Sequence, residues 1–208
     1  MVFVDGSLNV VVIGDWNRIY SKPEWIAKEI FDANEMNIKV DGWGNNFKLY
    51  FEKDNVVIIP KQERVTFRAL NLKDNTLEYF IGCINNYLNK AQTPKLTAYG
   101  LNIDLHDDDS NVFADEIDQM RDINPLIEAG YEILDTRIER EIKKDDTGKI
   151  QMIVDLNKDG TLKLHINEEY QEKEWKPIDL DFIKKYFRHC REIAACLGYT
   201  VKEDFDEK

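Results

Sequence analysis

Hydrophobic and polar residues alternate with a period of two along most of the chain, and this alternation predicts a mainly β structure. The first run lies in "LNVVVIGDW", and four more between residues 35 and 70 are separated by the polar segments "DGWGNN", "KDN" and "KQE". Short runs joined by such segments predict an antiparallel meander. A single strand is expected in "KLTAYGLNIDL", followed by a second meander in "YEILDTRIEREIKK", "KIQMIVDL" and "TLKLHINEEYQ".

Four segments show helical spacing instead. Their sequences are "SKPEWIAKEIFDAN", "DNTLEYFIGCINNYLNK", "SNVFADEIDQMRDINPLIEAG" and "PIDLDFIKKYFRHCREIAACLGY". Ser21 and Glu24 have the spacing of a capping box for the first helix, and Asp74 or Asn75 is the expected cap of the second. Gly198 predicts the end of the last helix, because glycine readily adopts the left-handed conformation that closes a helix.

The resulting order of elements, β-α-ββββ-α-β and then α-βββ-α, predicts an α+β fold. Each half is an antiparallel β-meander with a following helix, and we expect the helices to pack on sheet faces. The N-terminal half would span residues 1–110 and the C-terminal half residues 111–208. The two halves could also form one compact domain, since a chain of 208 residues is within the size range of a single domain.

The segment from "RVTFRALN" to "AYGLN", residues 64–102, resembles part of an uncharacterised, sporadically distributed bacterial protein family. In that family a meander, a helix and a strand like "AYGLN" precede a second meander and a final helix. The resemblance implies a bacterial cytoplasmic protein. It supplies neither an activity nor any site residue.

Charge narrows the classes of partner. The chain has 40 acidic residues against 28 Lys and Arg, a net charge of −12. An acidic surface repels nucleic acids and anionic membranes, so we expect neither as a direct partner and favour a protein partner. Three cysteines are too few for a disulfide framework and fit a reducing compartment. With neither a signal-peptide pattern at the start nor a run of roughly 20 apolar residues, we expect a soluble cytoplasmic protein.

The stretch "GLNIDLHDDDSN" is the main chemical candidate. On a strand, alternation places Asn102, Asp104 and His106 on one face. Asp104 and His106 are therefore the candidate catalytic pair, and both could bind one Mg²⁺ or Mn²⁺ ion. Three following residues could complete an oxygen-rich shell: Asp107, Asp108 and Asp109. The alternative, which we favour, is the wet face of a half-buried strand followed by a solvated turn.

A second candidate is the Ca²⁺-like loop in "DLNKDGTLKLHI". Asp155, Asn157 and Asp159 occupy positions one, three and five of an EF-hand loop, with Gly160 at position six. However, Ile166 stands at position twelve, where a bidentate Glu is required, and both flanks have the pattern of strands. We therefore favour a β-hairpin turn, with a weak Ca²⁺ site as the alternative.

Other chemistries find less support. His106, His165 and His189 could suggest zinc together with Cys190 and Cys196, but neither CxxC nor HxxxH occurs, and cysteines six apart on a helix point away from each other. The chain has no G-x-S-x-G elbow and no phosphate-binding glycine loop. We therefore expect no cofactor, with Mg²⁺, Mn²⁺ or Ca²⁺ as the alternatives.

Three hypotheses of function follow. The first is a non-catalytic protein-interaction module or complex subunit, with an acidic surface as its candidate binding surface, and an enzyme is disfavoured. The second is a divalent-metal-dependent hydrolase of a phosphate ester that uses Asp104, His106 and the neighbouring aspartates. The third is an acidic inhibitor of a nucleic-acid-binding protein, in which residues 104–118 would compete for a basic cleft. The oligomeric state is left open by the sequence.

Overall fold

The computed structural model describes residues 1–43, 46–91, 96–108, 124–143, 149–157, 159–171 and 175–202. The strands are β1 Val2–Phe3, β2 Asn9–Gly14, β3 Asn37–Trp43, β4 Asn46–Lys53, β5 Val56–Pro60, β6 Arg64–Ala69, β7 Leu96–Asp107, β8 Asp135–Lys143, β9 Lys149–Asn157 and β10 Leu162–Tyr170. The helical segments are η1 Arg18–Ser21, α1 Pro23–Trp25, η2 Ile26–Ile30, α2 Asp74–Lys90, α4 Asn124–Glu128 and α5 Leu180–Cys196.

The strands form one ten-stranded antiparallel sheet with the order β3-β4-β5-β6-β2-β7-β10-β9-β8, while β1 pairs with β7. The two predicted meanders are its two ends, and β2 and β7 join them in the middle. Because β7 pairs with β10 along nine residue pairs, the sheet continues across the predicted boundary at residue 110. The division into two halves stays a prediction.

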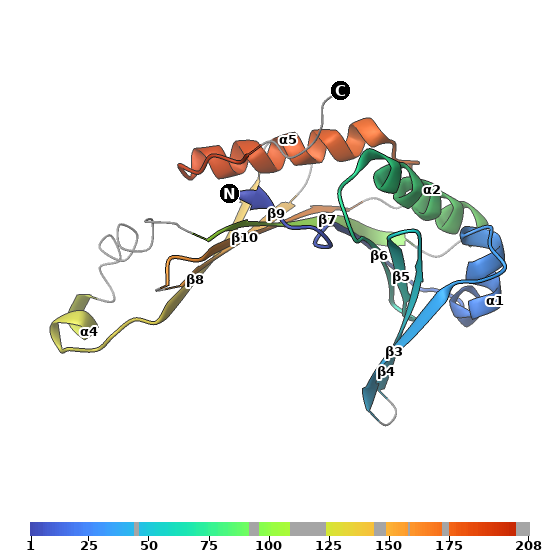
Figure 1. Cartoon of the computed structure of the whole chain (residues 1–208), viewed down its shortest axis with the longest axis horizontal. Helices are drawn as coiled ribbons and strands as arrows, with labels where there is room; N and C mark the ends of the chain where they lie inside the picture. Colours follow the sequence, from blue (N-terminus) through green and yellow to red (C-terminus); the bar gives the residue numbers. More distant parts are fainter. Residues whose placement is uncertain are drawn as a thin grey trace.

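The helices α2 and α5 lie on the same side of this sheet, above it in the view of Figure 1. From α5, the buried hydroxyl of Tyr186 donates to the main-chain oxygens of Leu101 on β7 and Ile166 on β10, at 3.0 and 2.8 Å. From α2, the fully buried Tyr87 packs its ring edge-on to Trp16 and Trp25. The Tyr186 hydrogen bonds tie α5 to β7 and β10, and an edge-on ring contact of Tyr87 with Phe67 ties α2 to β6.

Burial along residues 101–106 of β7 follows the predicted alternation. Leu101, Ile103 and Leu105 are fully buried on the helix side, whereas residues 102, 104 and 106 on the other side are half-buried. No described helix covers the middle of that other side (Figure 1). An antiparallel sheet tolerates this arrangement, because its hydrophobic residues can all point to one face. We call the side that carries Asp104 the open face.

Two predicted helix starts are wrong. The second helix has Lys73 at its cap position without a side-chain cap bond, because Asn71 instead accepts the Lys73 amide in a turn before the helix. The first helix lacks the Ser21–Glu24 capping box and is broken into η1, α1 and η2. Asn17 caps η1 by accepting the Ile19 amide at 3.0 Å.

The α+β prediction is confirmed as far as one antiparallel sheet with a few helices. The last helix follows the Asp179 cap and ends at Cys196, and Gly198 just beyond it has the left-handed φ of +87°. Of the third predicted helix, the five residues of α4 are described, and residues 109–123 lie outside the described residues, Asp109 among them. None of the described helices is long and apolar enough to cross a membrane.

Candidate functional site

The open face brings together polar residues from β7 and β10. The antiparallel register sets His165 opposite Asp104 and Lys163 opposite His106. Directly opposite residues in an antiparallel pair have Cβ atoms about 4.5–5.5 Å apart, so their side chains meet. The two strands therefore place a carboxylate, an imidazole and an ammonium group within reach of one another.

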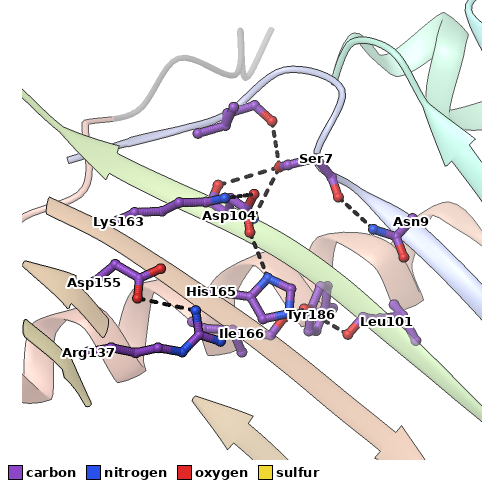
Figure 2. A network of polar contacts seen from close by, with 11 residues as sticks. Ser7, Asn9, Leu101, Asp104, Arg137, Asp155, Lys163, His165, Ile166 and Tyr186 are labelled. Atoms are coloured by element: carbon purple, nitrogen blue, oxygen red, sulfur yellow. Dashed lines mark hydrogen bonds and ion pairs between the residues drawn. The ribbon is translucent and has the colours of Figure 1, made fainter. Parts of the chain in front are cut away.

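Asp104 is the centre of this group (Figure 2). Its Oδ1 atom lies 2.6 Å from Nδ1 of His165, and its Oδ2 atom lies 2.9 Å from Nζ of Lys163. The Asp104 side chain is 18% exposed, against 30% for His165 and 49% for Lys163. Partial burial acts to raise the pKa of Asp104, but the hydrogen bonds from His165 and Lys163 and their charges outweigh it and lower the pKa. Asp104 is consequently held as a carboxylate.

The backbone around Asp104 is fixed by the turn between β1 and β2. The Asp104 amide donates to the hydroxyl of Ser7 at 3.1 Å, and the Asp104 main-chain oxygen accepts the Val4 amide at 2.9 Å. The Ser7 hydroxyl in turn donates to the Val4 oxygen at 2.6 Å. The Ser7 hydroxyl therefore forms hydrogen bonds with main-chain groups of this turn, and it is not the partner of the His165 ring.

This geometry suits proton transfer. A carboxylate bound to Nδ1 orients an imidazole so that its Nε2 atom can accept or give a proton. Among the described residues, Nε2 of His165 has no hydrogen-bond partner. Because the Asp104 carboxylate accepts hydrogen bonds, we assign the proton of this contact to Nδ1 of His165. Lys163 adds a positive charge on the other side of the same carboxylate.

Further ion pairs extend the group across β9 and β8. Arg137 on β8 lies 3.4 Å from Asp155 on β9, which is the cross-strand neighbour of Lys163. On the same face Gln151 donates to Glu139 at 2.5 Å, again between β9 and β8. The open face thus carries laterally paired side chains over four neighbouring strands.

The four residues proposed from sequence as one metal site lie in different surroundings. Asp104 contacts His165 and Lys163, as described above. The Nε2 atom of His106 lies 2.6 Å from Oδ1 of Asp108, whose side chain is 83% exposed. Asp107 points to the helix side, where its carboxylate accepts the Met1 ammonium group at 3.0 Å. In the described ranges, no group of three or more His, Cys, Asp and Glu side chains is placed to hold a metal ion.

The Ca²⁺-like segment lies at the turn between β9 and β10. The Asn157 amide donates to the Thr161 oxygen at 3.0 Å, and Gly160 has the left-handed φ of +87° that closes such a turn. The Asp159 carboxylate accepts both the amide and the hydroxyl of Thr161, at 2.9 and 2.7 Å. Strands flank the turn on both sides, as the sequence pattern favours. The Ca²⁺ reading of these residues stays a prediction.

A second histidine–carboxylate pair lies on the side of β10 that faces α5, the helix side, which we also call the covered face. Glu168 is 5% exposed, and its Oε2 atom lies 3.1 Å from Nδ1 of His189 on α5. The neighbouring Cys190 is fully buried, and burial raises the pKa of its thiol far above the usual range. Cys196 is exposed, so the two cysteines have different surroundings.

His165 is the residue that sequence reasoning missed as a partner of Asp104. The alternation of "TLKLHINEEY" places it on the polar side of a strand, but many polar strand residues are merely solvated. Only the register between β7 and β10, strands that are far apart in sequence, makes it the partner. Pairing of distant strands is not encoded in either segment alone.

No protein-family model matches this chain, and a search of curated proteins also gives no match. The function is therefore argued from the site itself.

Proposed function

We propose that this protein is a non-catalytic interaction module that binds a protein partner through the open face of its sheet. The observation that carries the proposal is the one-sided cover of the sheet, because α2 and α5 lie on the same side of it (Figure 1). The middle strands carry half-buried polar side chains on the other side. Side chains already held by ion pairs lose less conformational freedom when a partner binds.

The charge on the open face supports a polar partner of mixed charge. By the strand register, the basic and acidic residues on this face are equal in number. The basic residues are Lys39, Lys48, Arg64, Arg68, Arg137, Lys143, Lys149 and Lys163. The acidic residues are Asp41, Glu52, Asp104, Asp135, Glu139, Glu141, Asp155 and Glu169. The acidic excess of the chain therefore lies elsewhere.

This balance bears on the proposal of an acidic inhibitor. An inhibitor of a nucleic-acid-binding protein needs a strongly negative surface, and the open face does not supply one. The acidic stretch from residue 104 to residue 118 would have to supply it, and residues 109–118 lie outside the described residues. The interaction module is the better-supported form of the proposal.

Site-specific photo-cross-linking in the source cell tests the module. A photoreactive side chain replaces Asn102, on the open face, or Glu78, which is exposed on α2. We expect a discrete cross-linked polypeptide from position 102 and none from position 78. Equal cross-links from both positions, or none from position 102 in a full-length folded chain, would reject the open face as the interface.

A second candidate function is hydrolysis of a phosphate ester with His165 as general base. It is favoured by the 2.6 Å contact between His165 and Asp104 and by the neighbouring Lys163, whose charge could attract a phosphate. The test is hydrolysis of bis-p-nitrophenyl phosphate with and without Mn²⁺. Activity that is lost in His165→Gln and kept in His106→Gln would support this candidate, and an inactive wild-type protein would reject it.

A further inference from the structure

Five side chains form a row across the middle of the open face. The register sets Arg68 on β6 opposite Asn9 on β2, Asn9 opposite Asn102 on β7, Asn102 opposite Asn167 on β10, and Asn167 opposite Gln151 on β9. All five are half-buried. We call this set the amide row. Apart from Arg68 it is uncharged, unlike the paired charges on β8 and β9 beside it.

Arg68 is the unbalanced group of the amide row. Its Nε atom is buried, and within the described part of the chain this atom has no hydrogen-bond partner and the guanidinium group has no acidic partner. Its register neighbours on the two sides are Asn9 and Val57, neither of which carries a charge. A half-buried cation without a counter-ion is costly, because part of its hydration is lost without compensation. A carboxylate on the Nη atoms would supply the missing charge, in the forked geometry that guanidinium favours.

The amides of the row provide neutral donors and acceptors beside that charge. The side-chain amide of Asn9 already donates to the main-chain oxygen of Ser7 at 2.9 Å. The side-chain amides of Asn102 and Asn167 have no hydrogen-bond partner among the described residues, while their main chains pair within the sheet. At Gly100, a Cβ atom would lie 2.9 Å from Oδ1 of Asn167, so the Asn167 side chain lies over Gly100 of the neighbouring strand. Side-chain amides of this kind match the N–H and C=O groups of a peptide backbone.

We infer that the amide row binds an extended acidic segment of the partner protein, with one carboxylate of that segment on Arg68. This inference rests on the proposed function, whose partner it specifies. The row crosses four inter-strand spacings, about 19 Å, which is the length of about six extended residues. The net charge of −12 repels acidic peptides in general, so binding of such a peptide requires a local site of this kind.

Titration of the whole chain with acetyl-hexaglutamate amide, at low salt and neutral pH, tests this inference. The readout is the Nε–Hε signal of Arg68 in protein with ¹⁵N-labelled arginine. Arg64 supplies the matched control, because it lies on the same strand and the same face but is exposed. We expect the peptide to shift the Arg68 signal, Arg68→Gln to weaken binding at least tenfold, and Arg64→Gln to change it less than twofold.

Acetyl-hexaglutamine amide serves as the uncharged probe. Equal binding of both peptides, equal loss in Arg64→Gln and Arg68→Gln, or no binding of hexaglutamate would each overturn the inference. Thermal melting of Arg68→Gln verifies that the variant is folded, and Arg68→Lys tests the forked geometry with the charge kept. A cross-link from position 102 that survives Arg68→Gln would overturn the carboxylate contact and leave the proposed function standing.

Discussion

Strand β10 contributes one residue to a histidine–carboxylate pair on each of its two faces, and the two pairs have different surroundings. On the covered face Glu168 is almost completely buried against His189 of α5, with side-chain exposures of 7% and 20%. On the open face Asp104 and His165 are 18% and 30% exposed, and Lys163 joins them. Two pairs of the same chemical type thus differ in role. The Glu168–His189 pair is packed under a helix, and the Asp104–His165 pair is accessible on the open face.

The covered pair has a structural role, whereas the open pair stays accessible to a ligand. A buried charge has to be matched by the protein itself, because water is excluded, so Glu168 is accounted for by the fold. A half-buried pair keeps an exposed side, and His165 keeps Nε2 available to a ligand. Substitutions on the two faces should therefore differ in kind: loss of stability on the covered face and loss of binding on the open face.

The largest expected effect is that of Glu168→Ala. This substitution removes one member of a buried pair and leaves His189 without its partner, so we expect a loss of about 3 kcal/mol in the free energy of unfolding. Urea denaturation followed by circular dichroism measures it. The matched variant on the other face, Asp104→Ala, should lose about 1 kcal/mol. Equal losses would show that both pairs are packing elements.

A smaller loss is expected for Tyr186→Phe, which tests how α5 is fixed to the covered face. The hydroxyl of Tyr186 is buried, and its removal leaves the main-chain oxygens of Leu101 and Ile166 without this donor. We expect a loss of about 1–2 kcal/mol in the free energy of unfolding. Tyr131→Phe is the control, because Tyr131 is 66% exposed and its variant should unfold as the wild type does. An unchanged midpoint for Tyr186→Phe would contradict the contact.

The covered face was largely predictable from the sequence, because its signal is local. Period-two alternation located nearly every strand, and helical spacing located α2 at Asp74–Lys90 and most of α5. Helix caps were less predictable, since Lys73 stands at a cap position for which the sequence offered Asp74 or Asn75. Several competing polar side chains near a helix start leave the choice to tertiary contacts.

The open face was only half predictable. The alternation in "GLNIDLHDDDSN" correctly separated Leu101, Ile103 and Leu105 from the polar residues between them. It could not reveal that Asp104 faces His165, nor that Asp107, which alternation places on the side of Leu105, binds the Met1 ammonium group. Both depend on which strand pairs with β7, and that choice is made by the whole sheet.

Acid titration tests how much the Asp104 carboxylate stabilises the open face. Because the pKa of Asp104 is lowered in the folded state, its stabilising contribution is complete above the unfolded pKa, near 3.8, and is lost as the pH falls through the lower folded pKa. We expect Asp104→Asn to be about 1 kcal/mol less stable than the wild type at pH 7, with the gap closing below pH 3.8. Urea midpoints across this range measure the gap.

The control for the acid titration is Asp108→Asn, since the Asp108 side chain is 83% exposed and contacts only the neighbouring His106 in the described residues. Its stability should follow that of the wild type at every pH. A gap for Asp104→Asn that widens toward low pH would show that burial, rather than the contacts with His165 and Lys163, dominates the energetics of this carboxylate.

The smallest expected effect is that of divalent cations, and it separates a binding face from a metal-dependent enzyme. The carboxylate of Asp104 is occupied by His165 and Lys163, and that of Asp159 by Thr161, so a metal ion would have to displace these partners. We therefore expect millimolar Mn²⁺ or Ca²⁺ to leave the melting temperature unchanged in the wild type, in Asp104→Ala and in Asp159→Ala. A stabilisation by Mn²⁺ that only Asp104→Ala abolishes would instead support the metal-dependent hydrolase, because an ion that binds only the folded state raises its stability by mass action. Stabilisation by Ca²⁺ that only Asp159→Ala abolishes would place a cation at the β9–β10 turn and leave the open face, with its Asp104–His165 pair, available to a protein partner.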